Sequence, residues 1–313
     1  MAHVNTLLGT IHPEEIGTTA IHEHIMWGLP GWEFDPSAWP DIGKAFEKSY
    51  HELIDFRLLG GRTYVDCSGI GQGRDLDIYI KLAQSTGINI IASTGFCTDE
   101  GTAPYFRAKD IDYLEELYVH ELIEGMGHTK VKAGVIRVGN SEGQPTKLEE
   151  AQHRAAARAA KRTGAIVITN GVSSALWQLE TLMSEGLDAS RIVISHLDSK
   201  DNLDLERDKK IARAGAYVAY DQIGIEEWSH ASCAMSDARR VELVQEMLKL
   251  GFQDRMLLSA NSMGWRLEKD GLLLHSAAHV LRSFVPALRR AGVTEEALND
   301  MLIENPKRVL PIQ

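Results

Sequence analysis

The sequence has few cysteines, no long apolar run and no cluster of basic residues. Three cysteines among 313 residues (Cys67, Cys97 and Cys233) are too few for a disulfide framework, so we expect a reducing compartment. No apolar stretch approaches the roughly 18 residues that a membrane-spanning helix needs. Lys and Arg number 33 against 44 Asp and Glu, and the net charge of -11 includes no basic block suited to nucleic acid. The first residues lack the basic and apolar regions of a secretion signal. These absences predict a cytoplasmic protein whose partners include neither nucleic acid nor membrane.

The sequence does contain a regular alternation of short apolar runs and longer segments with helical periodicity. The apolar runs are rich in Val, Ile and Ala and have the length of strands; they cover residues 18–24, 63–68, 89–94, 131–138, 165–170, 191–196, 216–221 and 256–261. Eight strands alternating with helices are what a closed parallel barrel requires. No linker or low-complexity stretch divides the chain. We therefore predict an α/β fold, a single (β/α)8 TIM barrel over residues 1–313, with residues 4–13 as a short lid or hairpin beneath it.

Three long connections follow predicted strands, at residues 26–49, 222–237 and 262–275. Loops at the carboxyl ends of barrel strands usually shape substrate pockets. The first connection carries Trp27, Trp32, Phe34 and Trp39, which suit a pocket wall and equally suit a packed surface loop or a dimer contact. The second contains His230, a further pocket candidate.

Polar side chains gather where the predicted strands end, which is where barrel enzymes build active sites. They are His22, His24, Asp66, Cys67, Arg137, Asn170, His196, Asp221 and Asn261. Alternate residues of a strand share a face, so the two imidazoles of Thr19-Ala20-Ile21-His22-Glu23-His24 lie on one side, as in many divalent-metal sites. A single histidine at a strand end is more often a core or loop residue than a ligand. The convergence of several such positions on one mouth favours an active site.

Six segments resemble, in order, the blocks of the phosphotriesterase family of the amidohydrolase superfamily, which includes phosphotriesterase-like lactonases. They are residues 19–24, Val65-Asp66-Cys67-Ser68 with Gly73-Arg74-Asp75, and residues 132–138, 166–170, 192–196 and 257–261. The resemblance covers essentially the whole chain and implies an amidohydrolase-type barrel, a homodimer and a binuclear zinc-type centre. Such a centre activates a bridging hydroxide against phosphotriesters, lactones or esters, because a metal lowers the pKa of its bound water.

Half of the metal ligands that the resemblance implies are replaced in this sequence. His22, His24 and His196 match family ligands and are the residual metal candidates. Arg137 stands where the family has a bridging carbamylated lysine, Asn170 where it has a histidine, and Asn261 where it has an aspartate. An arginine carries only donors and stays protonated, and an amide is a weak ligand. We therefore expect no binuclear centre, and at most a divalent ion of the zinc type at reduced occupancy.

Three functional hypotheses follow. In the first, the protein is a metal-independent hydrolase of a lactone or carboxylic ester, with Arg137 as an electrostatic clamp on a substrate carboxylate or an oxyanion and a histidine as general base. In the second, it is a catalytically silent, ligand-binding barrel; in the third, an inactivated variant of a binuclear zinc hydrolase. The expected catalytic residues are His22, His24, Arg137 and His196. The expected pocket residues are Asn170, Asp221, Asn261, Cys97 and Trp27, with Asp221 as a structural acceptor for Arg137 and Cys67 as core packing.

Overall fold

The eight predicted strands all form and pair in parallel in chain order. The computed structural model describes residues 2–170, 174–199, 203–226, 235–267 and 275–312. Its barrel strands are β3 (Thr18–Trp27), β4 (Gly61–Asp66), β5 (Asn89–Thr94), β6 (Val135–Gly139), β7 (Ile166–Asn170), β8 (Ile192–Ile194), β9 (Tyr217–Tyr220) and β10 (Met256–Leu258). The prediction of a (β/α)8 barrel is confirmed. The strands β8, β9 and β10 end one to three residues before the predicted apolar runs do, so the last residues of those runs lie beyond the strands.

Hydrogen bonds just beyond β10 close the barrel against β3. The Asn261 N–H donates to the His22 carbonyl at 3.1 Å, and the His24 N–H donates to the Ser262 carbonyl at 2.8 Å. A ninth parallel strand, β11 (Met263–Arg266), then continues along the outer part of β3. The sequence predicted only a loop from residue 262 to 275. That prediction is wrong for β11, because β3 extends three residues past His24 and offers it a free edge.

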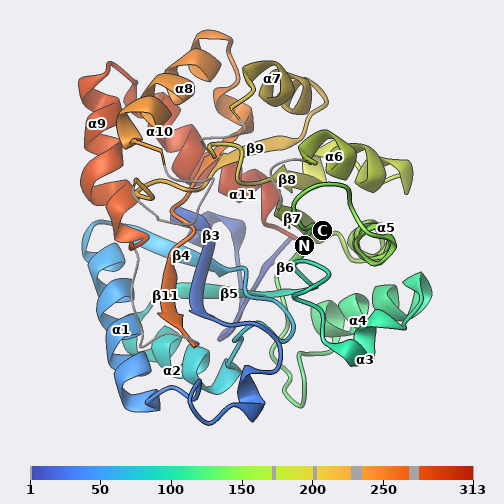
Figure 1. Ribbon diagram of the computed structural model, residues 1–313. Helices are drawn as coiled ribbons and strands as arrows, with labels where there is room; N and C mark the ends of the chain where they lie inside the picture. Colours follow the sequence, from blue (N-terminus) through green and yellow to red (C-terminus); the bar gives the residue numbers. More distant parts are fainter. Residues whose placement is uncertain (1, 171–173, 200–202, 227–234, 268–274, 313) are drawn as a thin grey trace.

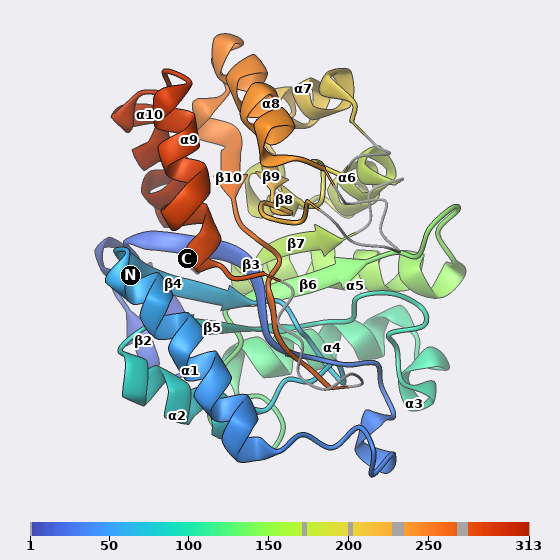
Figure 2. The same cartoon turned by 60° about the vertical axis from the view of Figure 1, so that its left-hand side comes forward.

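Helices surround the strands (Figures 1 and 2). They are α1 (Ile42–Leu58), α2 (Leu76–Thr86), α3 (Pro104–Arg107), α4 (Ile111–Ile123), α5 (Lys147–Thr163), α6 (Ala175–Ser184), α7 (Leu205–Arg213), α8 (Asp237–Lys249), α9 (Val285–Arg290), α10 (Glu295–Asn299) and α11 (Asn305–Val309). Local sequence sets their starts: α5, for example, begins with a capping box between Thr146 and Glu149. No helix in the described part of the chain is long and apolar enough to cross a membrane.

The barrel interior is apolar at its lower end and polar at its mouth. Ile21, Val65, Ile91 and Val135 belong to a buried cluster inside the barrel, and Val4 of the first hairpin packs into the same cluster. That hairpin joins β1 (Val4–Thr6) to β2 (Gly9–Ile11) and confirms the predicted hairpin under the barrel. The chain ends meet there, since His3 and Ile312 exchange backbone hydrogen bonds. The polar residues that the sequence predicts as a site lie at the opposite end.

Two buried carboxyl groups lie outside the barrel, between β3 and α1. Glu23 accepts hydrogen bonds from Ser259 Oγ at 2.6 Å and from the Ala260 and Ser262 amides at 2.8 and 2.6 Å. Burial raises the pKa of Glu23 to about 7. Burial, reinforced by the charge of Glu23, raises the pKa of Glu52 to about 8. Each group therefore stays protonated to a higher pH in the folded chain than in the unfolded one.

We expect the substitution Glu52→Gln to stabilise the protein at alkaline pH. The folded-state pKa lies above the unfolded value of about 4.5, so the wild type loses stability as pH rises from about 5 to 8. A neutral amide avoids that loss, and the melting temperature at pH 9 should rise by roughly 2–4 °C or more, with little change at pH 5. Thermal denaturation across this range measures the effect. Glu47→Gln on the exposed side of α1 is the control, and equal shifts at both pH values would contradict the expectation.

Candidate active site

The three predicted histidines meet at the mouth of the barrel. His22 and His24 lie on β3 and point inward because they are two residues apart, while Glu23 between them points outward. His196 follows β8 in a left-handed conformation, with φ of 60°. The ring centroids of His22 and His196 are 4.9 Å apart, and those of His22 and His24 are 5.7 Å apart. All three side chains are buried.

Asp221, just after β9, joins two of these histidines. His22 Nδ1 lies 2.8 Å from one carboxylate oxygen, and His196 Nδ1 lies 2.9 Å from the other, which also accepts the His196 backbone N–H at 2.8 Å. The predicted hydrogen bond from Arg137 to Asp221 does not form among the described residues, since Arg137 donates to Gln72 instead. Donation from Nδ1 to the ionised carboxylate leaves the Nε2 lone pairs available, and His22 Nδ1 also lies 3.2 Å from Ser195 Oγ. The Nε2 atom of His22 is buried and has no hydrogen-bond partner.

Burial sets the protonation states of these groups. It lowers the pKa of His22 to about 4, although Asp221 acts in the opposite direction. Burial and the positive charge of Arg137 hold the pKa of His24 well below its ordinary value. Burial alone would raise the pKa of Asp221, but His196 and His22 bring it well below its usual range. At neutral pH the site therefore contains an ionised carboxylate beside neutral His22 and His24.

Asp221 is itself held by a buried arginine. Asp198 accepts the Asp221 and Gln222 amides at 3.1 Å each, and Arg240 Nε donates to Asp198 at 2.9 Å. Arg240 and Asp198 are both fully buried. Their pairing fixes the backbone of Asp221 from behind, which is a structural use of Asp198.

Arg137 extends from β6 into the same mouth, where only 2% of it is exposed. Its Nη1 donates to Gln72 Oε1 at 2.8 Å, and its Nε has no partner. Sequence reasoning missed Gln72, which lies in the loop after β4. Gly71 and Gly73 flank it with φ of 79° and 99°, a conformation that glycine adopts readily and that turns the loop back over the mouth. A glutamine between two glycines after a barrel strand was the available signal.

The predicted pocket residues are only partly brought together. Asn170 Nδ2 donates to Cys97 Sγ at 3.0 Å, which places these two beside each other. Asn261 follows β10 with φ of 49°, and its buried Oδ1 has no partner. Trp27 ends β3, three residues beyond His24, and is only partly buried. His230 and Cys233 lie outside the described residues. Cys67 is fully buried in the barrel core, as expected, and burial raises the pKa of its thiol.

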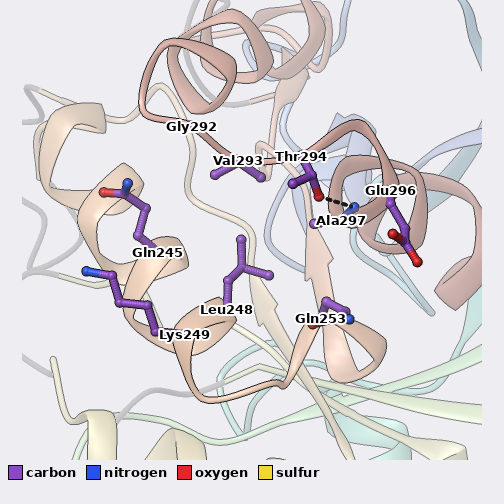
Figure 3. Close-up of a pocket in the computed structure, with 9 residues that line it drawn as sticks. All are labelled: Gln245, Leu248, Lys249, Gln253, Gly292, Val293, Thr294, Glu296 and Ala297. Atoms are coloured by element: carbon purple, nitrogen blue, oxygen red, sulfur yellow. Dashed lines mark hydrogen bonds between the residues drawn. The ribbon is translucent and has the colours of Figure 1, made fainter.

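A separate pocket of about 280 Å³ lies on the outer wall of the barrel, between α8 and the segment that leads into α10 (Figure 3). Leu248 and Val293 form its apolar surface, and Gln245 and Lys249 lie at its edge. None of the predicted site residues lines it. It is therefore not the site that the sequence predicted.

The family model described as Phosphotriesterase family matches residues 2–310. The chain belongs to the phosphotriesterase family. It is 30% identical to a phosphotriesterase homology protein of Mycobacterium tuberculosis, over 100% of this chain and 99% of that one. It is also 30% identical to an aryldialkylphosphatase of Saccharolobus solfataricus, over 96% of each chain. Among solved structures, a mutant of the phosphotriesterase-like lactonase of Deinococcus radiodurans superposes with a TM-score of 0.89 at 30% identity, covering 98% of this chain and 99% of that one. The predicted resemblance to the phosphotriesterase family of hydrolases and the predicted barrel fold are confirmed.

The mouth does not suit the two-metal centre of this phosphotriesterase-family fold. Among the residues that the structure describes, His22, His196 and Asp221 form the one group of possible ligands whose atoms lie within 4.8 Å of one another. Both oxygens of Asp221 already face imidazole Nδ1 atoms. The buried guanidinium of Arg137 acts on both His22 and His24 and disfavours positive charge there. The donor set therefore suits at most one weakly held ion.

We expect His22 to remain neutral, with its proton on Nδ1, down to about pH 5. Its pKa of about 4 lies below the unfolded value of about 6.5, so protonation is suppressed and stability falls as pH drops through this window. Long-range ¹H–¹⁵N NMR spectra report the tautomer directly. In Asp221→Asn the amide no longer selects Nδ1–H, and a mixture of tautomers should appear. The exposed His51 provides the reference signal, and titration of His22 near pH 6.5 would contradict this assignment.

Proposed function

We propose that this phosphotriesterase-family protein hydrolyses a lactone or a carboxylic ester without the binuclear metal centre of its family. The observation that carries the proposal is a buried arginine that faces histidines oriented by a carboxylate. Arg137 supplies positive charge where the family implies cations, and the Asp221–histidine arrangement supplies an oriented base. The lactonase among the structural relatives supports the substrate class.

His196 is the residue that we assign as general base. Its Nδ1 donates to Asp221, so its Nε2 can accept a proton from a water molecule that attacks the substrate carbonyl carbon. Asp221 then stabilises the imidazolium that forms, and this imidazolium returns the proton to the leaving alkoxide oxygen as the acyl C–O bond breaks. His22 has the same orientation, but with a pKa of about 4 it is a weak base at neutral pH. We assign His22 and His24 to the wall that positions the substrate.

Arg137 completes this mechanism by stabilising negative charge. A guanidinium in a buried site interacts strongly with an oxyanion, because little water screens the two charges. Ester and lactone hydrolysis develops one negative charge on the carbonyl oxygen, which one arginine can meet. A phosphotriester is a less suitable substrate, since the family meets its transition state with two metal ions.

The second candidate is a catalytically silent, ligand-binding barrel. Arg137, Asn170 and Asn261 stand at positions where the family has metal ligands, and this favours the second candidate. Such replacements are also what a natural or engineered loss of catalysis would leave behind. The oriented Nε2 atoms of His22 and His196 favour the enzyme, because ligand binding alone does not require two imidazoles fixed by one carboxylate.

We also propose a cytoplasmic homodimer. Phe34 is 89% exposed and Trp39 is 65% exposed, and both belong to the aromatic connection after β3. Large exposed apolar side chains so close together are typical of interaction surfaces. The small number of cysteines supports the reducing compartment.

Turnover of a lactone or ester should persist in the presence of a chelator. His196→Ala should lower kcat by about 10²- to 10⁴-fold, the usual contribution of a general base. Arg137→Ala should lower it by about 10²- to 10³-fold, as for loss of an oxyanion donor. Steady-state kinetics on a panel of lactones and esters measures both. Lys249→Ala, in the outer pocket, is the control. No turnover by the wild type, together with a ligand that raises its melting temperature, would support the binding barrel.

Restoring the family ligands should restore metal binding. The triple variant Arg137→Lys, Asn170→His and Asn261→Asp should hold about two zinc ions per chain, and the wild type should hold fewer than about one. Elemental analysis of both proteins, purified without chelator, gives the numbers. Two ions in the wild type would exclude the metal-independent mechanism. A large gain of hydrolysis in the triple variant, with an inert wild type, would identify an inactivated zinc hydrolase.

A further inference from the structure

The guanidinium of Arg137 has one unused edge. Its Nη1 donates to Gln72, whereas Nε is buried without a partner, and Nη2 makes no hydrogen bond to the described residues. The Nε–H and one N–H of Nη2 are parallel and lie on the side of the group away from Gln72. This edge is the one that matches the two oxygens of a carboxylate.

No carboxylate within the described ranges pairs with this buried charge. Asp221 also lies in the mouth, but its oxygens face the Nδ1 atoms of His22 and His196, at 2.8 and 2.9 Å, and no ion pair between Asp221 and Arg137 forms in the described part of the chain. Asp66 instead accepts the backbone amides of Ile25 and Ser68, at 2.7 and 3.0 Å. Removing a charge from water without a partner is strongly unfavourable, so the free protein contains a cation that lacks its anion.

Apart from the ionised Asp221, which faces His22 and His196, the polar groups near the mouth do not repel an anion. Asn170 and Asn261 replace what the family has as a histidine and an aspartate, and both amides are neutral. The Gln72 side chain turns its oxygen toward Arg137 and is itself buried. The changes from the family pattern therefore all act in one direction, from a site for cations toward a site for an anion.

We propose that the free edge of Arg137 binds a carboxylate that is a permanent part of the substrate. A transient oxyanion exists only in the transition state and leaves the buried charge unpaired for the rest of the cycle. A substrate carboxylate pairs with the buried charge of Arg137 from the moment that the substrate binds. This inference rests on the proposed hydrolase function but assigns the free edge of Arg137 to binding of the substrate carboxylate in place of oxyanion stabilisation. It narrows the substrate class to esters or lactones that carry a second, ionised carboxyl group close to the scissile bond.

Carboxylate binding can be tested without turnover. Thermal denaturation is followed with increasing acetate, with chloride adjusted to hold ionic strength constant. We expect a saturable rise in melting temperature for the wild type, a weaker one for Arg137→Lys, which keeps the charge without the fork, and none for Arg137→Met. Arg282→Gln removes a surface charge and should behave as the wild type. Inorganic phosphate is the comparison anion.

The melting temperatures measured without acetate provide a second test. Because Arg137→Met removes an unpaired buried charge, its melting temperature without acetate should equal or exceed that of the wild type. A large fall would mean that Arg137 is already paired in the folded protein and would overturn the proposal. Stabilisation by phosphate with none by acetate would overturn the assignment to a carboxylate.

Kinetics separates a bound carboxylate from an oxyanion clamp. An ester that bears a free carboxylate is compared with the same ester in which that group is methylated. The wild type should favour the charged substrate by about 10- to 100-fold in kcat/KM, the usual contribution of a charge-assisted hydrogen-bonded pair, and Arg137→Met should bring this ratio close to one. A wild-type ratio near one, or a ratio that Arg137→Met leaves unchanged, would overturn the proposal. If no ester reacts but acetate still protects through Arg137, the hydrolase function fails while the carboxylate site stands.

Discussion

The Asp221 carboxylate lies between the imidazoles of His22 and His196 and connects three strands of the barrel through one charged group. This contact has one consequence for the two histidines and another for the carboxylate. The histidines keep their Nδ1 atoms toward the carboxylate, so their Nε2 atoms carry the lone pairs. No ion pair between this carboxylate and Arg137 forms among the described residues, so the arginine stays a separate charge. Asp198 and Arg240 fix this arrangement from behind by holding the backbone of Asp221.

Electrostatics in the mouth depends on keeping Arg137 and Asp221 apart. Buried opposite charges usually pair, because an unpaired one is costly. Here the imidazoles of His22 and His196 face the carboxylate, and burial keeps the pKa values of His22 and His24 low enough for these two to remain neutral. The result is a mouth with an oriented base at one position and an unpaired cation at another. Two metal ions would need ligands that carry more negative charge than this mouth offers. Hydrolysis of a neutral or anionic carbonyl compound does not need such ligands.

The eight barrel strands could be predicted from the sequence because parallel strands buried on both faces read as short apolar runs. The strand β11 could not, because its formation depends on the free edge that β3 offers beyond His24. Nor could the pair Glu23 and Glu52, whose raised pKa values come from burial between β3 and α1. Residues 222–237 and 262–275 were predicted as long loops; part of each lies outside the described residues.

The sequence by itself determined the barrel, the family and the set of polar residues at the strand ends, since periodicity and residue type are properties of the chain. It also predicted that Arg137 is not a metal ligand and that the amides of Asn170 and Asn261 are weak ones. Only the tertiary structure decided which side chains pair with one another. Asp221 joins His22 and His196, and Arg137 is left with Gln72, because pairing depends on the distances between atoms from different strands and on which groups are shielded from water.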